Sequence, residues 1–272
     1  MNTPAVLTRI LDHKRSQLRE LQQQDIVAMR DAAFAARARR SNHVFVSALK
    51  AKATATIAEV KRLSPSAGNI RPGEDAVSRA LAYARGGAAA VSVLTEESHF
   101  GGSIEDLRAI SAKASVPVLR KDFLFGEAQI YQAATAGADA ILLITGFLEP
   151  DLLQRLRKLT EDELHMDALV EVHTAEEWAI ARDCGATLVG VNNRNLGTLA
   201  VSLDVSRQLA SGIREGELAV SESGISNREQ IEELQNLGFR AFLVGESLMR
   251  ADDPEKALAS LLGQSKGEQH AR

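Results

Sequence analysis

Cysteine is almost absent from this sequence. Cys184 is the only one, so the chain cannot form an intramolecular disulfide, and a reducing compartment is expected. Aromatic residues are scarce at 4%, and with 19 glycines the composition fits neither a disulfide-built scaffold nor a low-complexity chain. No apolar run is long enough to span a membrane, and the N-terminus lacks the apolar core of a signal peptide. We therefore expect a soluble, cytoplasmic protein with no membrane partner.

A strong charge bias is also missing. The chain has 32 basic and 36 acidic residues and a net charge of −4, which gives no electrostatic footprint for nucleic acid. Its six histidines show no H-x-x-x-H or H-x-H spacing, so we expect no metal site. No G-x-x-x-x-G-K-[ST] motif is present, which disfavours nucleotide hydrolysis.

What the sequence does contain is a repeated pattern from residue 56 onward. Eight short apolar runs alternate with helical patterns at intervals of roughly 20 to 30 residues, as βα units require. Their near-continuous Val, Ile, Leu and Ala content suits strands buried on both faces of a parallel sheet. The predicted strands are Thr56–Val60, Ala88–Leu94, Val116–Arg120, Ala138–Ile144, Asp167–Val172, Thr187–Val191, Leu218–Ser221 and Ala241–Val244.

Helix start and stop signals lie between these runs. Asp253 followed by Pro254 places an N-cap before a proline at the first helical position. Gly-Ala pairs recur where a helix would end and the next strand begin. Capping-box pairs, or pairs close to that form, are Thr174 with Glu177, Ser226 with Glu229 and Ser103 with Asp106.

These signals predict an α/β fold, a single-domain (β/α)8 barrel, which typically takes roughly 250 residues. We expect an N-terminal helical extension over residues 1–45, the barrel over 56–262 and a frayed tail over 263–272. The basic run Arg37–Ser41 is interpreted as a solvated helix end. The competing fold is a doubly wound open sheet, which would carry a Gly-rich dinucleotide loop after its first strand. The segment Glu59–Gly68 contains no G-x-G-x-x-G.

Polar side chains gather at the ends of the predicted strands, whereas the strand starts carry few charges. Because barrel active sites are built at the C-terminal strand ends, this asymmetry predicts a site there. Glu59 and Lys61 point the same way, since strand side chains alternate faces with a period of two. A structural salt bridge is the alternative for that pair. The other strand-end residues are Lys121, Phe123, Glu171, Asn192, Arg194 and Glu222.

The last two predicted strands end in small, glycine-containing loops, Ser221-Glu-Ser-Gly224 and Val244-Gly-Glu-Ser247. Loops after strands 7 and 8 are a common phosphate site of this fold, and Ser64 and Ser66 would lie beside them once the barrel closes. The alternative is that these are simple tight turns, which need Gly and Ser anyway. We favour a phosphate site.

Other polar or aromatic positions have simpler interpretations. Glu96-Glu97 is interpreted as a solvated loop, and Trp178 as a packing residue within a helix. His173 lies just beyond Glu171 on the same face, where it is either a proton carrier or the residue before a helix cap; we favour the second.

Seven short motifs are spread along the chain. They are Glu59-Val-Lys-Arg-Leu-Ser-Pro-Ser66, Ser92-Val-Leu-Thr95, Phe100-Gly-Gly-Ser103, Arg120-Lys-Asp-Phe123, Gly190-Val-Asn-Asn-Arg-Asn-Leu196, Ser221-Glu-Ser-Gly-Ile225 and Phe242-Leu-Val-Gly-Glu-Ser-Leu-Met249. In this order and spacing they resemble indole-3-glycerol-phosphate synthase of tryptophan biosynthesis, over nearly the whole chain. The resemblance implies a (β/α)8 lyase that works without a cofactor. Its reaction converts 1-(2-carboxyphenylamino)-1-deoxyribulose 5-phosphate into indole-3-glycerol phosphate, CO₂ and water.

The resemblance also implies catalytic roles. A ring carbon must attack a ketone, so an acid has to protonate the forming alkoxide, and the match places Lys121 in that role. The dehydration that follows decarboxylation needs an acid and a base. The match points to Glu171 as the base, with Glu59 and Lys61 assisting. Asn192 and Glu222 complete the catalytic candidates.

Substrate-binding residues follow from the same resemblance. Arg194, with Lys61 and Asn192, suits the substrate carboxylate, and Phe100, Phe123 and Leu196 suit its aromatic ring. The expected phosphate cradle is Ser64, Ser223, Gly224, Gly245 and the backbone of Glu246. Glu246 departs from relatives that have Ser there. We expect its side chain to turn to solvent while its N–H faces the phosphate.

Other functions stay open from the sequence. One is a different phosphosugar barrel, such as a phosphoribosylanthranilate isomerase or a Schiff-base aldolase using Lys121. Another is a catalytically silent barrel that binds a phosphorylated ligand or acts as a scaffold, which has no reason to keep buried ions. The expected partner is a small phosphosugar substrate carrying an anthranilate ring. We expect a monomer, with weak association with other tryptophan-pathway enzymes as the alternative.

Overall fold

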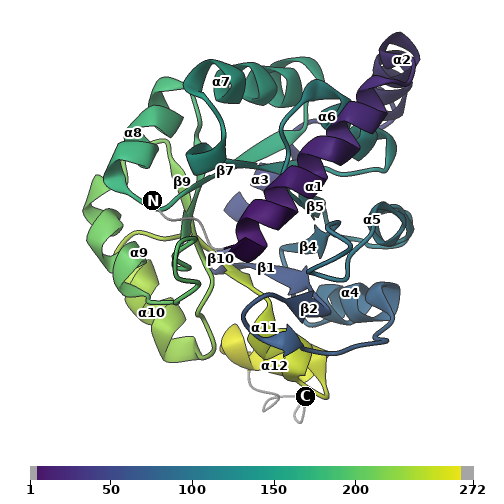
Figure 1. Cartoon of the computed structure of the whole chain (residues 1–272). Coiled ribbons are helices and arrows are strands. Elements are labelled where there is room, and N and C mark those ends of the chain that lie inside the picture. Colours follow the sequence, from purple (N-terminus) through teal and green to yellow (C-terminus); the bar gives the residue numbers. More distant parts are fainter. Residues whose placement is uncertain (1–4, 265–272) are drawn as a thin grey trace.

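Eight parallel strands form a closed barrel in the computed structural model, which describes residues 5–264 (Figure 1). Hydrogen bonds join them in the order β1-β10-β9-β8-β7-β6-β5-β4, and β1 pairs with β4 to close the ring. The predicted (β/α)8 barrel is therefore confirmed, and the open doubly wound sheet is wrong. The strands are β1 (Ala55–Val60), β4 (Ala90–Leu94), β5 (Val118–Lys121), β6 (Ala140–Ile144), β7 (Asp167–Val172), β8 (Leu188–Asn192), β9 (Leu218–Glu222) and β10 (Ala241–Val244).

The strand ends differ from the predicted ones by one or two residues. β4 and β6 begin two residues later than predicted, because Gly87 and Gly137 (φ 97° and 87°) end the preceding helices in the left-handed region. β5, β8 and β9 end one residue later than predicted, so that Lys121, Asn192 and Glu222 are their last residues. Functional side chains are thus held by the barrel ladder itself.

Helices surround the barrel and precede it. Three come before β1, and a short hairpin of β2 (Leu63–Ser64) and β3 (Gly68–Asn69) follows β1. The helices are α1 (Ala5–Gln22), α2 (Ile26–Arg37), α3 (Val44–Lys50), α4 (Ala76–Arg85), α5 (Ile104–Ser111), α6 (Glu127–Thr135), α7 (Pro150–Lys158), α8 (Ala175–Asp183), α9 (Asp204–Leu209), α10 (Arg228–Asn236), α11 (Glu246–Arg250) and α12 (Pro254–Leu261), with short helical turns η1 (Thr145–Phe147), η2 (Leu159–Glu163) and η3 (Ala210–Gly212). None of the helices within residues 5–264 is long and apolar enough to cross a membrane.

Three of the predicted helix caps are confirmed. The side chains of Ser103, Thr174 and Asp253 accept hydrogen bonds from the first turns of α5, α8 and α12. The predicted box of Ser226 with Glu229 is wrong by one residue. Asn227 is the N-cap of α10 and forms the capping box with Gln230, because its amide oxygen is also a strong cap acceptor.

The barrel interior changes from apolar to charged toward the carboxyl ends of the strands. On β5 and β7, Leu119 and Leu169 are fully buried in the apolar interior cluster. Two residues further on, the same inward faces carry Lys121 and Glu171. The apolar layers make a rigid floor, and the charged layer above them faces a cavity.

The N-terminal extension is fastened to both ends of the barrel. In Figure 1, α1 (purple) lies across the viewed end, and Lys14 of α1 reaches the carboxylate of Asp122 at 2.9 Å. The prediction of a solvated helix end at Arg37 is wrong. Arg37 is 5% exposed, and its guanidinium donates to the carbonyl oxygens of Leu164 and His165. Local composition could not reveal this, because these acceptors lie more than a hundred residues away. Of the predicted frayed tail, residues 265–272 lie outside the described residues.

Candidate active site

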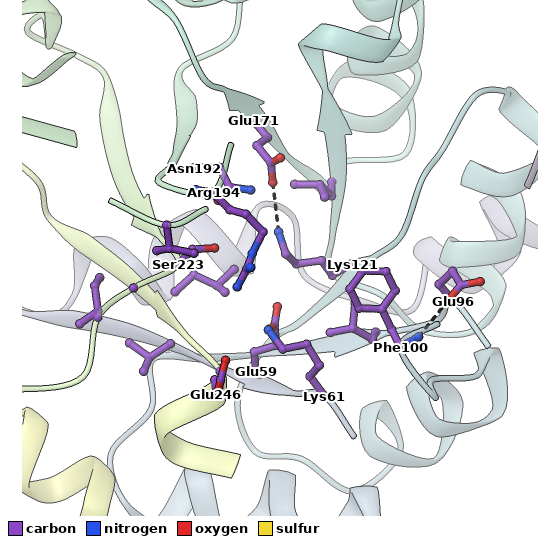
Figure 2. A pocket seen from close by; sticks show the side chains of 18 of the residues that line it. Glu59, Lys61, Glu96, Phe100, Lys121, Glu171, Asn192, Arg194, Ser223 and Glu246 are labelled. Carbon is purple, nitrogen blue, oxygen red and sulfur yellow. Dashed lines mark hydrogen bonds and ion pairs between the residues drawn. The ribbon is translucent and has the colours of Figure 1, made fainter. Parts of the chain in front are cut away.

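A cavity of about 470 Å³ opens at the carboxyl ends of the strands. Thirteen of the fifteen predicted site residues line it: Glu59, Lys61, Phe100, Lys121, Phe123, Glu171, Asn192, Arg194, Leu196, Ser223, Gly224, Gly245 and Glu246. The other two, Ser64 and Glu222, are buried beside it. Figure 2 shows side chains from opposite sides of the barrel pointing into the same space. The predicted convergence at one rim is therefore present.

Lys121 is the centre of the charged layer. Its Nζ lies 2.7 Å from Glu222 Oε2 and 3.2 Å from Glu171 Oε2. Burial disfavours the ammonium, but the carboxylates of Glu222, Glu171 and Glu59 outweigh burial and raise the pKa of Lys121 above its ordinary value. Lys121 is therefore a charged ammonium at the cavity.

The two carboxylates that hold Lys121 differ in their proton affinity. Burial opposes ionisation of Glu171, but Lys121, His173 and Asn192 outweigh it and hold the pKa of Glu171 below its ordinary range. For Glu222, burial and the neighbouring charges of Glu171 and Glu59 outweigh the attraction of Lys121 and raise the pKa to about 7. Glu171 is thus ionised at neutral pH, while Glu222 titrates there.

Glu222 fits its place because Gly190 has no side chain. A Cβ on Gly190 would clash with Glu222 Oε1, and that oxygen is buried without a hydrogen-bond partner within the described residues. Gly190 lies on β8 directly beside Val220 of β9, two residues before Glu222. The glycine in the Gly190–Leu196 motif therefore provides the space that the Glu222 carboxylate occupies.

Glu59 and Lys61 form a second pair across the cavity from Glu171. Lys61 Nζ lies 2.6 Å from Glu59 Oε1, so the predicted common direction of the two side chains is confirmed. A Cβ on Gly245 would lie 2.5 Å from Glu59 Oε1 and 3.2 Å from Lys61 Nζ. Gly245, predicted only for the phosphate cradle, therefore also makes room for this pair.

Aromatic rings form one wall of the cavity. The centroids of Phe100 and Phe123 are 6.4 Å apart, and the ring of Phe147, outside the cavity lining, lies 6.0 Å from that of Phe123. Phe147 was missed in the sequence because it belongs to the turn η1 after β6, outside every recognised motif. Arg194 stands opposite, where its Nη1 donates to Ser66 Oγ at 2.8 Å and to Leu199 O at 3.1 Å. A ligand with a flat aromatic ring and a carboxylate would therefore contact the apolar Phe wall and the Arg194 guanidinium at the same time.

The loops after β9 and β10 form the other wall. Ser223 and Gly224 both have positive φ (67° and 84°), which turns the backbone sharply at the end of β9. The Glu246 carboxylate accepts from Arg250 Nε at 3.0 Å, one turn further along α11, and its side chain is 40% exposed. Its negative charge is therefore paired with an arginine. Ser64 Oγ accepts from the N–H of Ala67 at 3.0 Å and lies outside the cavity lining.

Glu96 corrects a prediction. It was expected in a solvated loop, yet it is fully buried and lines the cavity. Its carboxylate accepts from the backbone N–H groups of His99 at 2.7 Å and Phe100 at 3.0 Å, and Figure 2 shows this contact beside the Phe100 ring. Three backbone donors satisfy the buried charge, and in return Glu96 fixes the loop that carries Phe100. Glu97 is exposed, as predicted.

Behind Lys121 lies a buried ionic network that sequence reasoning also missed. Asp122 is 3% exposed and pairs with Lys14 at 2.9 Å and with Arg120 at 3.1 Å, while Thr95 Oγ1 donates to it. Burial alone would raise the pKa of Asp122, but Arg120 and Lys14 outweigh it and hold that pKa below its ordinary value. The Arg-Lys-Asp order on one strand was the available signal, but its partner Lys14 is 108 residues away.

Two further sequence interpretations concern α8 and its start. Trp178 is 2% exposed within α8, which confirms its packing role. His173 precedes the N-cap Thr174, as favoured, but its ring also lies between Glu171 and Glu177. Among residues 5–264, no group of three or more His, Cys, Asp or Glu side chains is arranged to hold a metal ion.

The chain is similar to known proteins along most of its length. A family model described as Indole-3-glycerol phosphate synthase matches residues 7–261. A relative of that name from Syntrophobacter fumaroxidans is 50% identical over 207 residues, which cover 76% of this chain and 78% of the relative. Another from Aquifex aeolicus is 43% identical over 227 residues, covering 83% and 88%. Among solved structures, KGPDC from Streptococcus mutans has a TM-score of 0.60 at 12% identity, covering 78% of this chain and 97% of that one, a likeness of fold alone.

Proposed function

The chain belongs to the indole-3-glycerol phosphate synthase family and is a carboxy-lyase of tryptophan biosynthesis, and we propose that it closes the indole ring in the cavity described above. Its substrate is then 1-(2-carboxyphenylamino)-1-deoxyribulose 5-phosphate, and its products are indole-3-glycerol phosphate, CO₂ and water. The observation that supports this site most strongly is the ammonium of Lys121, held at the cavity by Glu171 and Glu222.

Ring closure needs a proton donor at the ketone. The substrate ring carbon that carries the carboxylate attacks the ketone carbon, and the carbonyl oxygen becomes an alkoxide unless it is protonated. The bond from that ring carbon to the carboxylate then breaks, CO₂ leaves, and the electron pair of the bond restores the aromatic ring. Lys121 is the best placed acid, because its carboxylate neighbours keep it charged until an alkoxide approaches. Phe100 and Phe123 supply the apolar wall against which the ring is oriented for this attack.

Dehydration needs an acid for the departing hydroxyl and a base for the proton that is lost. Glu171 suits the base, since the pKa of its carboxyl is held low and its carboxylate lines the cavity. Lys61, paired with Glu59 on the other side, suits the acid. We assign the roles to the charged set, because groups this close titrate together.

Contacts at the two ends of the substrate, its carboxylate and its phosphate, fix its orientation in the cavity. The Arg194 guanidinium and the Asn192 amide are the groups offered to the substrate carboxylate. The backbone around Ser223, Gly224 and Gly245 is offered to the phosphate, with Ser64 supporting the loop after β1 from outside the cavity. The reaction requires no redox or carbanion-stabilising cofactor, so the proposal includes none.

The Schiff-base aldolase alternative is disfavoured by the same geometry. A lysine that forms a Schiff base must be a neutral amine, usually through desolvation or a nearby cation. Lys121 instead has two carboxylates in contact, which keep it protonated. A silent barrel is disfavoured because four or more buried ions at a cavity cost stability without a use.

The test is a direct assay of the purified protein. The carboxyphenylamino-deoxyribulose phosphate is added, and indole absorbance and fluorescence are followed together with CO₂ release. We expect both signals to rise in equal amounts. A folded protein that releases neither, or a borohydride-trapped adduct on Lys121, would contradict the proposal.

A further inference from the structure

His173 lies behind the proposed base. It follows β7 by one residue, and its Nε2 is 3.5 Å from Glu171 Oε1. That nitrogen is buried and has no hydrogen-bond partner within the described residues. The other oxygen of the same carboxylate, Oε2, contacts Lys121. The Glu171 carboxylate is thus placed between an ammonium on the cavity side and an imidazole on the far side.

The orientation of the imidazole is fixed from α8. His173 Nδ1 lies 3.3 Å from Glu177 Oε2, and the same oxygen accepts the backbone N–H of His173 at 2.6 Å. Glu177 is itself held at the start of α8, where its N–H donates to the Thr174 side chain. A Cβ on Gly146 of η1 would lie 3.0 Å from Glu177 Oε1, so the neighbouring turn leaves just enough room for this carboxylate. With Nδ1–H directed at Glu177, Nε2 is the atom presented to Glu171.

His173 does not line the cavity, whereas Glu171, whose carboxylate it faces, does. The charged groups facing it are Glu171 on β7, Glu177 on α8 and Glu222 on β9, all acidic. Burial opposes the imidazolium, but these carboxylates outweigh burial and raise the pKa of His173 above its ordinary value. Its surroundings therefore favour the charged form near neutral pH.

We propose that His173 is a positioning residue for Glu171, which it holds by Nε2 in the ionised state and in the orientation needed to accept a proton from the substrate. Glu177 acts one step further out, by fixing the ring. This inference rests on the proposed role of Glu171 as base. It changes that role from a single residue to a Glu177–His173–Glu171 chain leading from α8 to the cavity.

Two amide substitutions separate the functions of the two ring nitrogens. His173→Gln places an amide N–H near the position of Nε2, whereas His173→Asn places one near Nδ1. We expect kcat of His173→Asn to fall roughly tenfold or more, with KM little changed, and His173→Gln to keep more of the rate. Both lack the imidazolium, so the acidic limb of the kcat profile should move to higher pH by about one unit.

His165→Asn is the matched control. It lies before β7 at the opposite end of the barrel, with φ 52°, a backbone conformation that Asn tolerates. We expect its kcat and pH profile to match those of the parent. Thermal unfolding of all variants, with kcat measured from pH 5 to 9, completes the experiment.

Several outcomes would overturn the inference. One is a folded His173→Gln or His173→Asn with the parent acidic limb and kcat, and another is a loss of rate that follows unfolding temperature alone. If His173→Asn does not fold, the pH of the acidic limb in the kcat profile of His173→Gln alone tests the inference. Glu171→Gln, measured alongside, keeps the two proposals apart. If it keeps its turnover, the proposed base is wrong. If it is inactive while the His173 variants are normal, only the present inference fails.

Discussion

At the scale of single residues, the protonation states in the site depend on a few charged groups, in which carboxylates outnumber ammonium groups. Lys121 is one ammonium among three nearby carboxylates, Glu59, Glu171 and Glu222. Neutralising any of them changes the proton affinity of the others, because the groups are coupled at short distance. The clearest consequences concern Glu222, which lies out of the cavity but in contact with Lys121.

Replacing Gly190 tests whether the space beside Glu222 is needed. In Gly190→Ala the new methyl group would clash with Oε1 and push the carboxylate away from Lys121. We expect kcat/KM to fall about tenfold or more, with a lower unfolding temperature. A double-mutant cycle with Glu222→Ala provides the control, since the methyl group has no carboxylate to displace in that background. Equal losses in both backgrounds would contradict the account.

The pKa of Glu222 predicts a pH dependence of stability. Burial raises that pKa to about 7, above the value of 4.5 expected for an unfolded glutamate. The folded state therefore holds the proton more tightly, and the stability it contributes is present below pH 4.5 and lost as the pH rises through 7. Glu222→Gln cannot titrate. We expect its free energy of unfolding, relative to the parent, to increase by on the order of 2 kcal/mol between pH 5 and pH 8.

Urea unfolding of both proteins at pH 5, 6, 7 and 8 measures this difference. Glu229→Gln is a suitable control, because Glu229 is an exposed glutamate in the first turn of α10. A constant difference between parent and Glu222→Gln over this range would mean that Glu222 titrates as an ordinary glutamate.

The sequence predicted most of the charged residues at the strand ends but misjudged single buried ones. Lys121, Glu171 and Asn192 could be found because strand ends follow from apolar runs, and barrels build their sites there. Glu96 and Arg37 could not, because burial depends on the donors and acceptors that meet them after folding. A charged residue in a polar stretch is interpreted as solvated unless those partners are known.

At the scale of elements, α1 is part of the catalytic end of the barrel. Lys14 carries its charge into a buried network with Asp122, which directly follows Lys121 on the chain. The periodic apolar residues predicted the helices of the N-terminal extension. They did not predict where these helices lie on the barrel. Nothing local distinguishes Lys14 from the exposed basic residues of the same helix. The pairing that decides its position spans 108 residues.

Lys14→Met tests this docking contact. Methionine keeps the apolar stem but removes the ammonium, and Asp122 then keeps the Arg120 guanidinium, the Thr95 hydroxyl and the Phe123 N–H as partners in a dry setting. We expect a loss of about 3 kcal/mol in unfolding free energy, together with a reduced kcat because the strand end carrying Lys121 loosens. Asp12→Ala, on an exposed pair of the same helix, should cost less than about 1 kcal/mol. Similar losses for both variants in urea unfolding would show that α1 is not fastened through Lys14.

Strand assignment was accurate at the scale of elements, and the errors at the starts of β4 and β6 have a common cause. β7 and β10 were predicted residue for residue. β4 and β6 were predicted to begin two residues before their observed first residues. The alanine after each left-handed glycine is apolar and buried, but it belongs to the connection between helix and strand.

At the scale of the whole molecule, barrel closure creates the site. Residues from β1, β5, β7 and β8 face one cavity only because β1 pairs with β4 and completes the ring. An open sheet with the same strands would spread these charges along an edge, where each would be solvated. The single-domain organisation, the monomeric state and the cytoplasmic location stay predictions from the sequence.

The central claim is that the charged ring around Lys121 performs the chemistry. The most direct measurement compares single turnover of the carboxyphenylamino-deoxyribulose phosphate by the parent, Lys121→Ala and Glu171→Gln, with Lys113→Ala, a lysine exposed before β5, as the matched control. We predict that the rate of indole formation falls about a hundred- to ten-thousandfold in the first two variants and stays at the parent value in the control, with all four proteins folded. Indole formation by folded Lys121→Ala at the parent rate would contradict the account.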